Sequence, residues 1–193
     1  VAKLPKVRTN IEVIHKEYSP IPKSLREEHS SLIFSGDMVK IVVGDSKTGW
    51  TKALELYFSI LSEKIYSDVN TIILDYDNVR PKGERLVKFG GYASGHNSLK
   101  GMFEKIDAII KDRGSEDNPR VNLRPIDCLD IANIIGENVV CGGVRRTAEI
   151  ALFSADDEEV LQAKSNLYMQ ENGEWKINPK TAHRSMSNNS IQY

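Results

Sequence analysis

Three glycine-containing turns carry the residue types that could do chemistry in this sequence, and that chemistry would be anion binding. The turns lie at residues 44–46, 89–95 and 141–146. Glycine lets a backbone approach a ligand closely, and the free N–H groups at a helix start attract phosphate. Basic residues that suit phosphate accompany the turns: Arg80, Lys82, Arg85, Lys88, Arg145 and Arg146. Solvated surface is the alternative for such basic loops, and the residue types alone leave both interpretations open.

Asp45 is the carboxylate of most interest, because it follows an apolar strand pattern and precedes a helical one. A carboxylate in such a turn can accept hydrogen bonds from ribose hydroxyls while the helix start faces phosphate. The alternative is an ordinary helix N-cap, worth about 1 kcal/mol. Spacing alone favours the N-cap.

The residue types offer no catalytic set and no metal-ligand spacing. Cys128 and Cys141 lie among apolar neighbours, so we expect buried, inert thiols. His96 and His183 are isolated, and we expect neither to do chemistry. We therefore predict no catalytic and no metal-binding residues.

An α/β arrangement must position these turns. Residues 38–44 and 69–76 are typical of strands, and residues 50–65 carry apolar side chains at helical intervals of three and four. Strand, helix, strand is the βαβ pattern. Further helices are expected near residues 98–113, 125–136 and 156–164, and further strands near 148–153 and 187–193. Residues 1–30 contain three prolines and no sustained period, which predicts an extended lead-in.

The composition excludes several classes of protein. The 193 residues include 26 Lys and Arg and 27 Asp and Glu, and the net charge of −1 gives no field for bulk nucleic acid. Hydrophobic residues at 40% and charged residues at 27% are typical of a globular protein. The apolar runs are shorter than the ~20 residues of a membrane span, and the two cysteines favour a reducing, cytoplasmic setting. The first residues have neither Met nor an apolar leader, which suggests a fragment.

Several blocks of sequence resemble the large chain of ribonucleotide reductases. These blocks are residues 44–50, 79–86, 89–95, 124–127, 142–150 and 183–190. Their order and spacing are most similar to the monomeric, adenosylcobalamin-dependent (class II) ribonucleoside-triphosphate reductases. The resemblance implies an α/β fold in which residues 31–193 form part of a ten-stranded barrel, with residues 1–30 unplaced.

The same resemblance implies what this segment binds. The parent enzyme would reduce ribonucleoside triphosphates to deoxyribonucleotides for DNA replication, by radical chemistry and with a thioredoxin-type reductant. A deoxynucleoside triphosphate effector would contact Asp45, Ser46, Lys47, Arg80, Lys88, Gly90 and Gly91. A specificity loop would report the effector to the substrate through Gly142, Gly143, Val144, Arg145 and Arg146. Guanidinium groups of these loops tied up by carboxylates would argue against the assignment.

The sequence also departs from the family pattern. The family's Asn-Pro-Cys-Gly-Glu radical loop does not occur in these 193 residues, and the two cysteines lie in the wrong motifs for the family's redox thiols. The resemblance therefore implies an adenosylcobalamin-dependent parent, while we expect this segment to bind no cobalamin and to be inactive alone. The alternatives are a stand-alone nucleotide-binding regulatory module and a reductase with a diiron partner subunit. Strand edges left uncovered in a partial barrel predict self-association.

Overall fold

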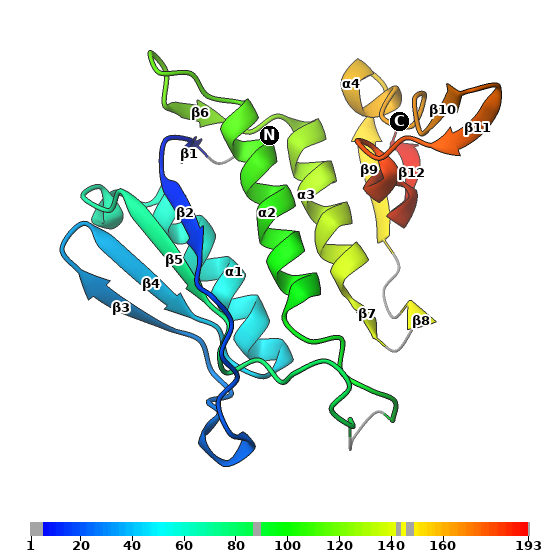
Figure 1. Ribbon diagram of the computed structural model, residues 1–193. Helices are drawn as coiled ribbons and strands as arrows, with labels where there is room; N and C mark the ends of the chain where they lie inside the picture. The colour runs from blue at the N-terminus through cyan, green and yellow to red at the C-terminus, as the bar shows by residue number, and fades with distance from the viewer. Residues whose placement is uncertain (1–5, 87–89, 142–143, 146–148, 193) are drawn as a thin grey trace. The chain divides into compact units, whose positions relative to one another are not determined.

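The computed structural model describes residues 6–86, 90–141, 144–145 and 149–192. The chain divides into two units, Val1–Asn122 and Leu123–Tyr193. The elements of the first unit are β1 (Lys6–Arg8), β2 (Glu12–His15), the 3-10 turn η1 (Lys23–Leu25), β3 (Ser31–Ser35), β4 (Met38–Val42), α1 (Lys47–Ser62), η2 (Lys64–Tyr66), β5 (Thr71–Asp75), α2 (Asn97–Asp112) and β6 (Arg120–Asn122). Those of the second unit are α3 (Pro125–Asn138), β7 (Val140–Cys141), β8 (Val144–Arg145), β9 (Glu149–Ser154), α4 (Glu158–Leu161), β10 (Tyr168–Glu171), β11 (Glu174–Ile177), η3 (Ala182–Met186) and β12 (Ser187–Gln192) (Figure 1).

A four-stranded sheet in the order β2-β5-β4-β3 forms the base of the first unit. Strands β2 and β4 both run parallel to β5, so the predicted βαβ pattern of β4, α1 and β5 is confirmed. Strand β3 pairs antiparallel with β4 through a tight turn in which Gly36 has a φ of 61°. The sequence did not predict β3, and it placed β2 inside the extended lead-in.

The core of this unit lies between the sheet and the helices α1 and α2. Val39 and Ile41 alternate with partly exposed neighbours along β4, which gives the strand one fully buried face. Helix α1 contributes buried residues such as Tyr57, whose ring meets Phe103 of α2 edge to face at 5.5 Å. The 3.6-residue period that predicted both helices is therefore the pattern of their buried faces.

Helix α3 starts the second unit as the sequence predicts. Pro125 occupies the first turn, and the Arg124 N–H donates to the Asp127 carboxylate at 2.8 Å. Strands β9 and β12 pair in parallel, and β10 and β11 form an antiparallel hairpin. Helix α4 is shorter than the predicted 156–164, since its N-cap is Asp157 and it ends at Leu161.

The α/β class is confirmed, but the residues that the structure describes form no closed barrel. Apart from the four-stranded sheet, the described residues form four two-stranded sheets. Nor does any helix among them have the length and hydropathy to span a membrane.

Candidate functional site

The structure brings Asp45 and Arg80 together at one edge of the parallel sheet. Asp45 follows β4 and Arg80 follows β5, and the carboxyl ends of parallel strands meet at the same edge. The Arg80 Nε donates to the two Asp45 carboxylate oxygens at 2.9 and 3.0 Å, and the Arg80 backbone N–H donates to Oδ1 at 3.2 Å. This hydrogen bond raises the pKa of Arg80, which keeps the guanidinium charged. Each group therefore satisfies the other in this structure.

The helix N-cap belongs to Ser46, not to Asp45. The Ser46 hydroxyl accepts a hydrogen bond from the Gly49 N–H at 2.9 Å, and the same hydroxyl donates to the Glu28 carbonyl at 2.6 Å. The N-cap interpretation of Asp45 is therefore wrong. Its carboxylate turns toward β5 instead, where the long-range ion pair is available.

A preceding segment of the chain packs against the turn at residues 44–49. The Gly44 N–H donates to the Ser30 hydroxyl at 2.8 Å, and the Asp45 N–H donates to the Glu27 carbonyl at 2.8 Å. A Cβ at Gly44 would lie 2.4 Å from the Glu28 carbonyl oxygen. Glycine is required here because two backbone segments touch, and these two N–H groups already have protein acceptors. An anion at this turn would rely on side chains and on the N–H groups that follow.

The second predicted turn has the backbone that its glycines suggest. Gly90 and Gly91 have φ values of 68° and 80°, which disfavour any side chain. The Leu86 N–H donates to the Gly91 carbonyl at 2.9 Å, and Arg85 and Tyr92 form an isolated bridge. Leu86 and Gly91 are thus hydrogen-bonded neighbours in the segment that follows Arg80.

Several predicted site residues lie outside the described part of the chain. Lys88, Gly142, Gly143 and Arg146 belong to this group. Val144 and Arg145 are described as the backbone of β8, which pairs antiparallel with β7. Lys47 is exposed at the first position of α1.

A second ionic cluster, which the sequence analysis missed, joins η3 to α3. Arg184 donates to both oxygens of Asp130 at 2.6 and 2.7 Å, and His183 Nε2 lies 2.9 Å from Asp130 Oδ1. Burial alone would raise the pKa of Asp130, but the hydrogen bonds from Arg184 and His183 hold it below its usual value. His183 therefore has a carboxylate partner. The available signal was an acidic residue among the apolar positions of a predicted helix.

The other predicted histidine and the described thiol have structural surroundings. His96 stacks on Tyr18 with ring centroids 3.7 Å apart, so it is not isolated either. Cys128 is half-buried and forms no disulfide. Burial and, to a smaller extent, the charge of Asp127 raise the pKa of its thiol, as expected of an inert cysteine. The side chain of Cys141 is outside the described set.

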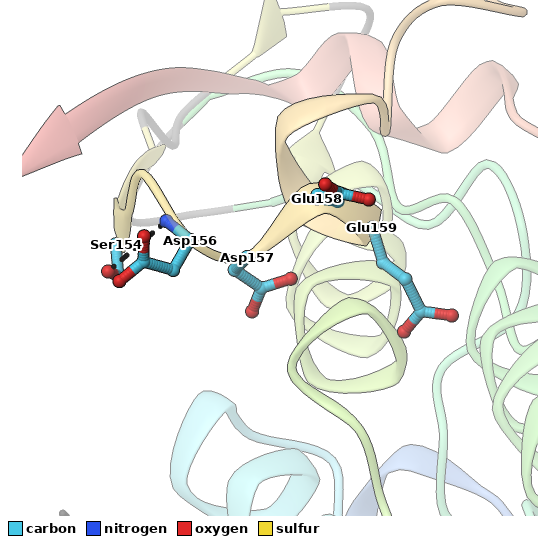
Figure 2. Close-up of a pocket in the computed structure, with 5 residues that line it drawn as sticks. All are labelled: Ser154, Asp156, Asp157, Glu158 and Glu159. Atoms are coloured by element: carbon cyan, nitrogen blue, oxygen red, sulfur yellow. Dashed lines mark hydrogen bonds between the residues drawn. The ribbon is translucent and has the colours of Figure 1, made fainter.

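An acidic hollow marks the start of α4 (Figure 2). It is lined by Ser154, Asp156, Asp157, Glu158 and Glu159. The Asp157 carboxylate accepts from the Val160 N–H at 3.1 Å and so caps the helix. Across the described ranges no group of three or more His, Cys, Asp or Glu side chains could hold a metal ion. The hollow is therefore consistent with helix capping and a solvated surface.

The segment that carries Asp45 and Arg80 matches a family of known proteins. A family profile described as "B12-dependent ribonucleotide reductase, insertion domain" matches residues 12–110, about half of the chain. The chain belongs to the B12-dependent ribonucleotide reductase family. This assignment favours the cobalamin class over the diiron alternative. The matched range contains the four-stranded sheet, which therefore belongs to the part that the profile describes as an insertion domain. The sequence analysis did not predict an insertion domain.

Individual reductases of this family align along most of the chain. The adenosylcobalamin-dependent ribonucleoside-triphosphate reductase of Lacticaseibacillus paracasei is 32% identical over 94% of this chain and 25% of its own length. The enzyme of the same name from Lactobacillus acidophilus is 34% identical over 79% of this chain and 20% of its own. A crystal structure of a B12-dependent (class II) ribonucleotide reductase superposes with a TM-score of 0.69 at 25% identity, covering 97% of this chain and 24% of that one. The chain thus spans between a fifth and a quarter of the length of these relatives.

The described residues do not fit adenosylcobalamin. A corrin needs a broad apolar wall and many hydrogen-bond partners for its rim of amides. The acidic hollow offers carboxylates, and a second hollow in the second unit offers only Glu149 and Ser187 as hydrogen-bonding side chains beside leucine, isoleucine and alanine side chains and Cys128. No described residue is therefore assigned to the cofactor.

Proposed function

We propose that this chain is the nucleotide-sensing part of an adenosylcobalamin-dependent ribonucleoside-triphosphate reductase. The parent enzyme would reduce ribonucleoside triphosphates by radical chemistry, with its cobalamin and redox thiols held by the part of the enzyme that this chain does not span. The chain itself would not reduce ribonucleotides, because the family's radical loop does not occur in its sequence. The family match and the alignment to reductases of that name support this proposal.

We propose further that a deoxynucleoside triphosphate effector binds at the sheet edge that carries Asp45 and Arg80. The observation that carries this proposal is the meeting of the two side chains from the ends of β4 and β5, although 35 residues separate them in the sequence. Ligands of open α/β sheets bind beyond the carboxyl ends of parallel strands. The start of the 16-residue helix α1 adds the positive end of a helix dipole to the same edge.

Effector binding at this edge would open the Asp45–Arg80 pair. Arg80 would exchange a carboxylate for the effector phosphate, whose oxygens can likewise accept two hydrogen bonds from a guanidinium. The Asp45 carboxylate would then accept hydrogen bonds from the ribose while retaining the Arg80 backbone N–H. The ion pair that argues against a permanently open site is compatible with one that exchanges partners.

We assign the second unit to the barrel side of the parent enzyme. Its strands β9 and β12 pair in parallel, and parallel sheets are usually covered on both faces and extended by further strands. Residues 142–148, between β7 and β9, would connect the effector to the substrate. This proposal keeps the predicted partial barrel for the second unit alone.

Isothermal titration with dATP, dGTP, dCTP and dTTP tests the effector site. We expect Asp45→Ala and Arg80→Ala each to weaken the tightest of the four about tenfold or more, since each removes a charge-assisted contact. Lys52→Ala is the matched control, because Lys52 pairs with Glu55 on the exposed side of α1. Equal affinity for the wild type and both site variants would refute the assignment.

A further inference from the structure

A second arginine lies against the carboxylate of the proposed effector site. Arg26 follows η1, in the part of the sequence that predicted only a lead-in, and its side chain is 9% exposed. Its Nη1 donates to Glu84 Oε2 at 2.7 Å and lies 3.8 Å from Asp45 Oδ2. Its Nε donates to the Ile21 carbonyl at 3.0 Å. Arg26 is thus bonded to one carboxylate and adjacent to another.

The four side chains form a row of alternating charge, in the order Arg80, Asp45, Arg26, Glu84. The inner two are the most buried: Asp45 is 10% exposed, whereas Arg80 is 33% and Glu84 is 21% exposed. Removing the partner of a buried carboxylate is strongly unfavourable, because the charge is left without solvent or counterion. A phosphate that attracted Arg80 would place Asp45 in that position.

We propose that Arg26 is a positioning residue that pairs with the Asp45 carboxylate when Arg80 turns to the effector phosphate. This inference rests on the proposed function. Closing the 3.8 Å gap to hydrogen-bond distance requires a movement of about 1 Å, which the Nη end can make while Nε stays on the Ile21 carbonyl. Glu84 releases Arg26 more easily than Asp45 would, because it is the more exposed carboxylate.

The chemistry of guanidinium explains why arginine suits this exchange. Its planar fork presents several donors in fixed directions, so one end can stay anchored while the other shifts between two carboxylates. Effector binding would therefore change the partner of the Asp45 carboxylate from Arg80 to Arg26, the other arginine beside it in the row. The segment 26–30 would follow, since it also bonds the turn at residues 44–49.

A double-mutant cycle without nucleotide tests whether Arg26 can replace Arg80. All variants carry Glu84→Gln, so that removing Arg26 leaves no unpaired carboxylate at Glu84. We expect Arg26→Met and Arg80→Met together to lower the urea midpoint by more than the sum of their separate shifts, because either arginine alone can neutralise Asp45. Adding Asp45→Asn should abolish that excess. Additive shifts in the Asp45 protein would overturn the inference.

Nucleotide titration separates this inference from the proposed function. We expect Arg26→Met to raise the Kd of the tightest deoxynucleoside triphosphate about tenfold, and Lys23→Met, exposed on η1, to leave it unchanged. Loss of binding in Arg80→Met with wild-type binding in Arg26→Met would overturn the inference and leave the proposed function intact. Absence of binding in the wild-type chain would refute the proposed function, while the cycle without nucleotide still decides whether Arg26 takes over Asp45.

Discussion

Arg8 offers the sharpest test of how the first unit is held together. Its guanidinium donates to four backbone carbonyls: Nη1 to those of Ser67 and Val69 at 3.1 and 2.8 Å, and Nη2 to those of Ile60 and Tyr66 at 2.7 and 2.8 Å. These carbonyls lie at and beyond the C-terminal end of α1, where a helix leaves acceptors without intrahelical partners. A cation there also interacts favourably with the helix dipole.

We expect Arg8→Met to destabilise the first unit by about 3 kcal/mol. Three of the four hydrogen bonds are part-buried, and each contributes roughly 1 kcal/mol after the competition with water. With a slope near 2 kcal/mol/M, the urea midpoint should fall by about 1.5 M. Equilibrium unfolding followed by circular dichroism measures this shift, and Arg8→Lys should lose an intermediate amount because ammonium lacks the planar fork.

Arg120→Met is the matched control for Arg8→Met. Arg120 makes one exposed hydrogen bond, to the Ser62 carbonyl at the same helix end, at 2.8 Å. Burial and then the charge of Arg120 lower the pKa of Arg8, so removing Arg120 also relieves a repulsion. We expect a change below about 0.5 kcal/mol for the control. Equal losses for the two variants would refute the view that the four carbonyls anchor Arg8.

Three further substitutions have expected outcomes in the same urea assay or in a pH series. Gly44→Ala should cost more than about 2 kcal/mol, because its Cβ would lie 2.4 Å from a backbone oxygen. Gly101→Ala should stabilise by about 0.5–1 kcal/mol, since it lies within α2 with nothing inside 4 Å of the new methyl group; a loss there would contradict the close-contact argument. Although burial opposes it, the hydrogen bond from Arg184 helps to lower the pKa of Asp130. That pair should therefore stabilise the second unit above about pH 4, with the contribution lost as the pH falls through the lowered pKa. Asp130→Asn should flatten the acid side of the melting-temperature profile, and an unchanged profile would count against the pair.

The spacing of apolar residues along the sequence was sufficient to predict the helices and strands that have a buried face of their own. Five elements lie close to their predicted ranges: the strands β4 and β5 and the helices α1, α2 and α3. Apolar residues recur at every second position in the strands and at every third or fourth position in the helices, and these spacings are the ones that a buried face requires. The hairpin partner β3 and the edge strand β2 were missed. Their residues are mostly exposed, and pairing with another strand, β4 for β3 and the distant β5 for β2, rather than burial of their own pattern makes them strands.

The candidate site divides in the same way. Residue types and the family resemblance drew attention to Asp45 and Arg80, and the sequence predicted that each follows a strand of one βαβ pattern. Only the tertiary structure decided that they pair with each other, that Ser46 is the N-cap, and that Arg26 lies 3.8 Å from the same carboxylate. The physical reason is distance along the chain. A hydrophobic period is decided by neighbours within a few residues. An ion pair across 35 residues, and with it which of the adjacent residues Asp45 and Ser46 caps α1, depends on how separate strands come to share one edge.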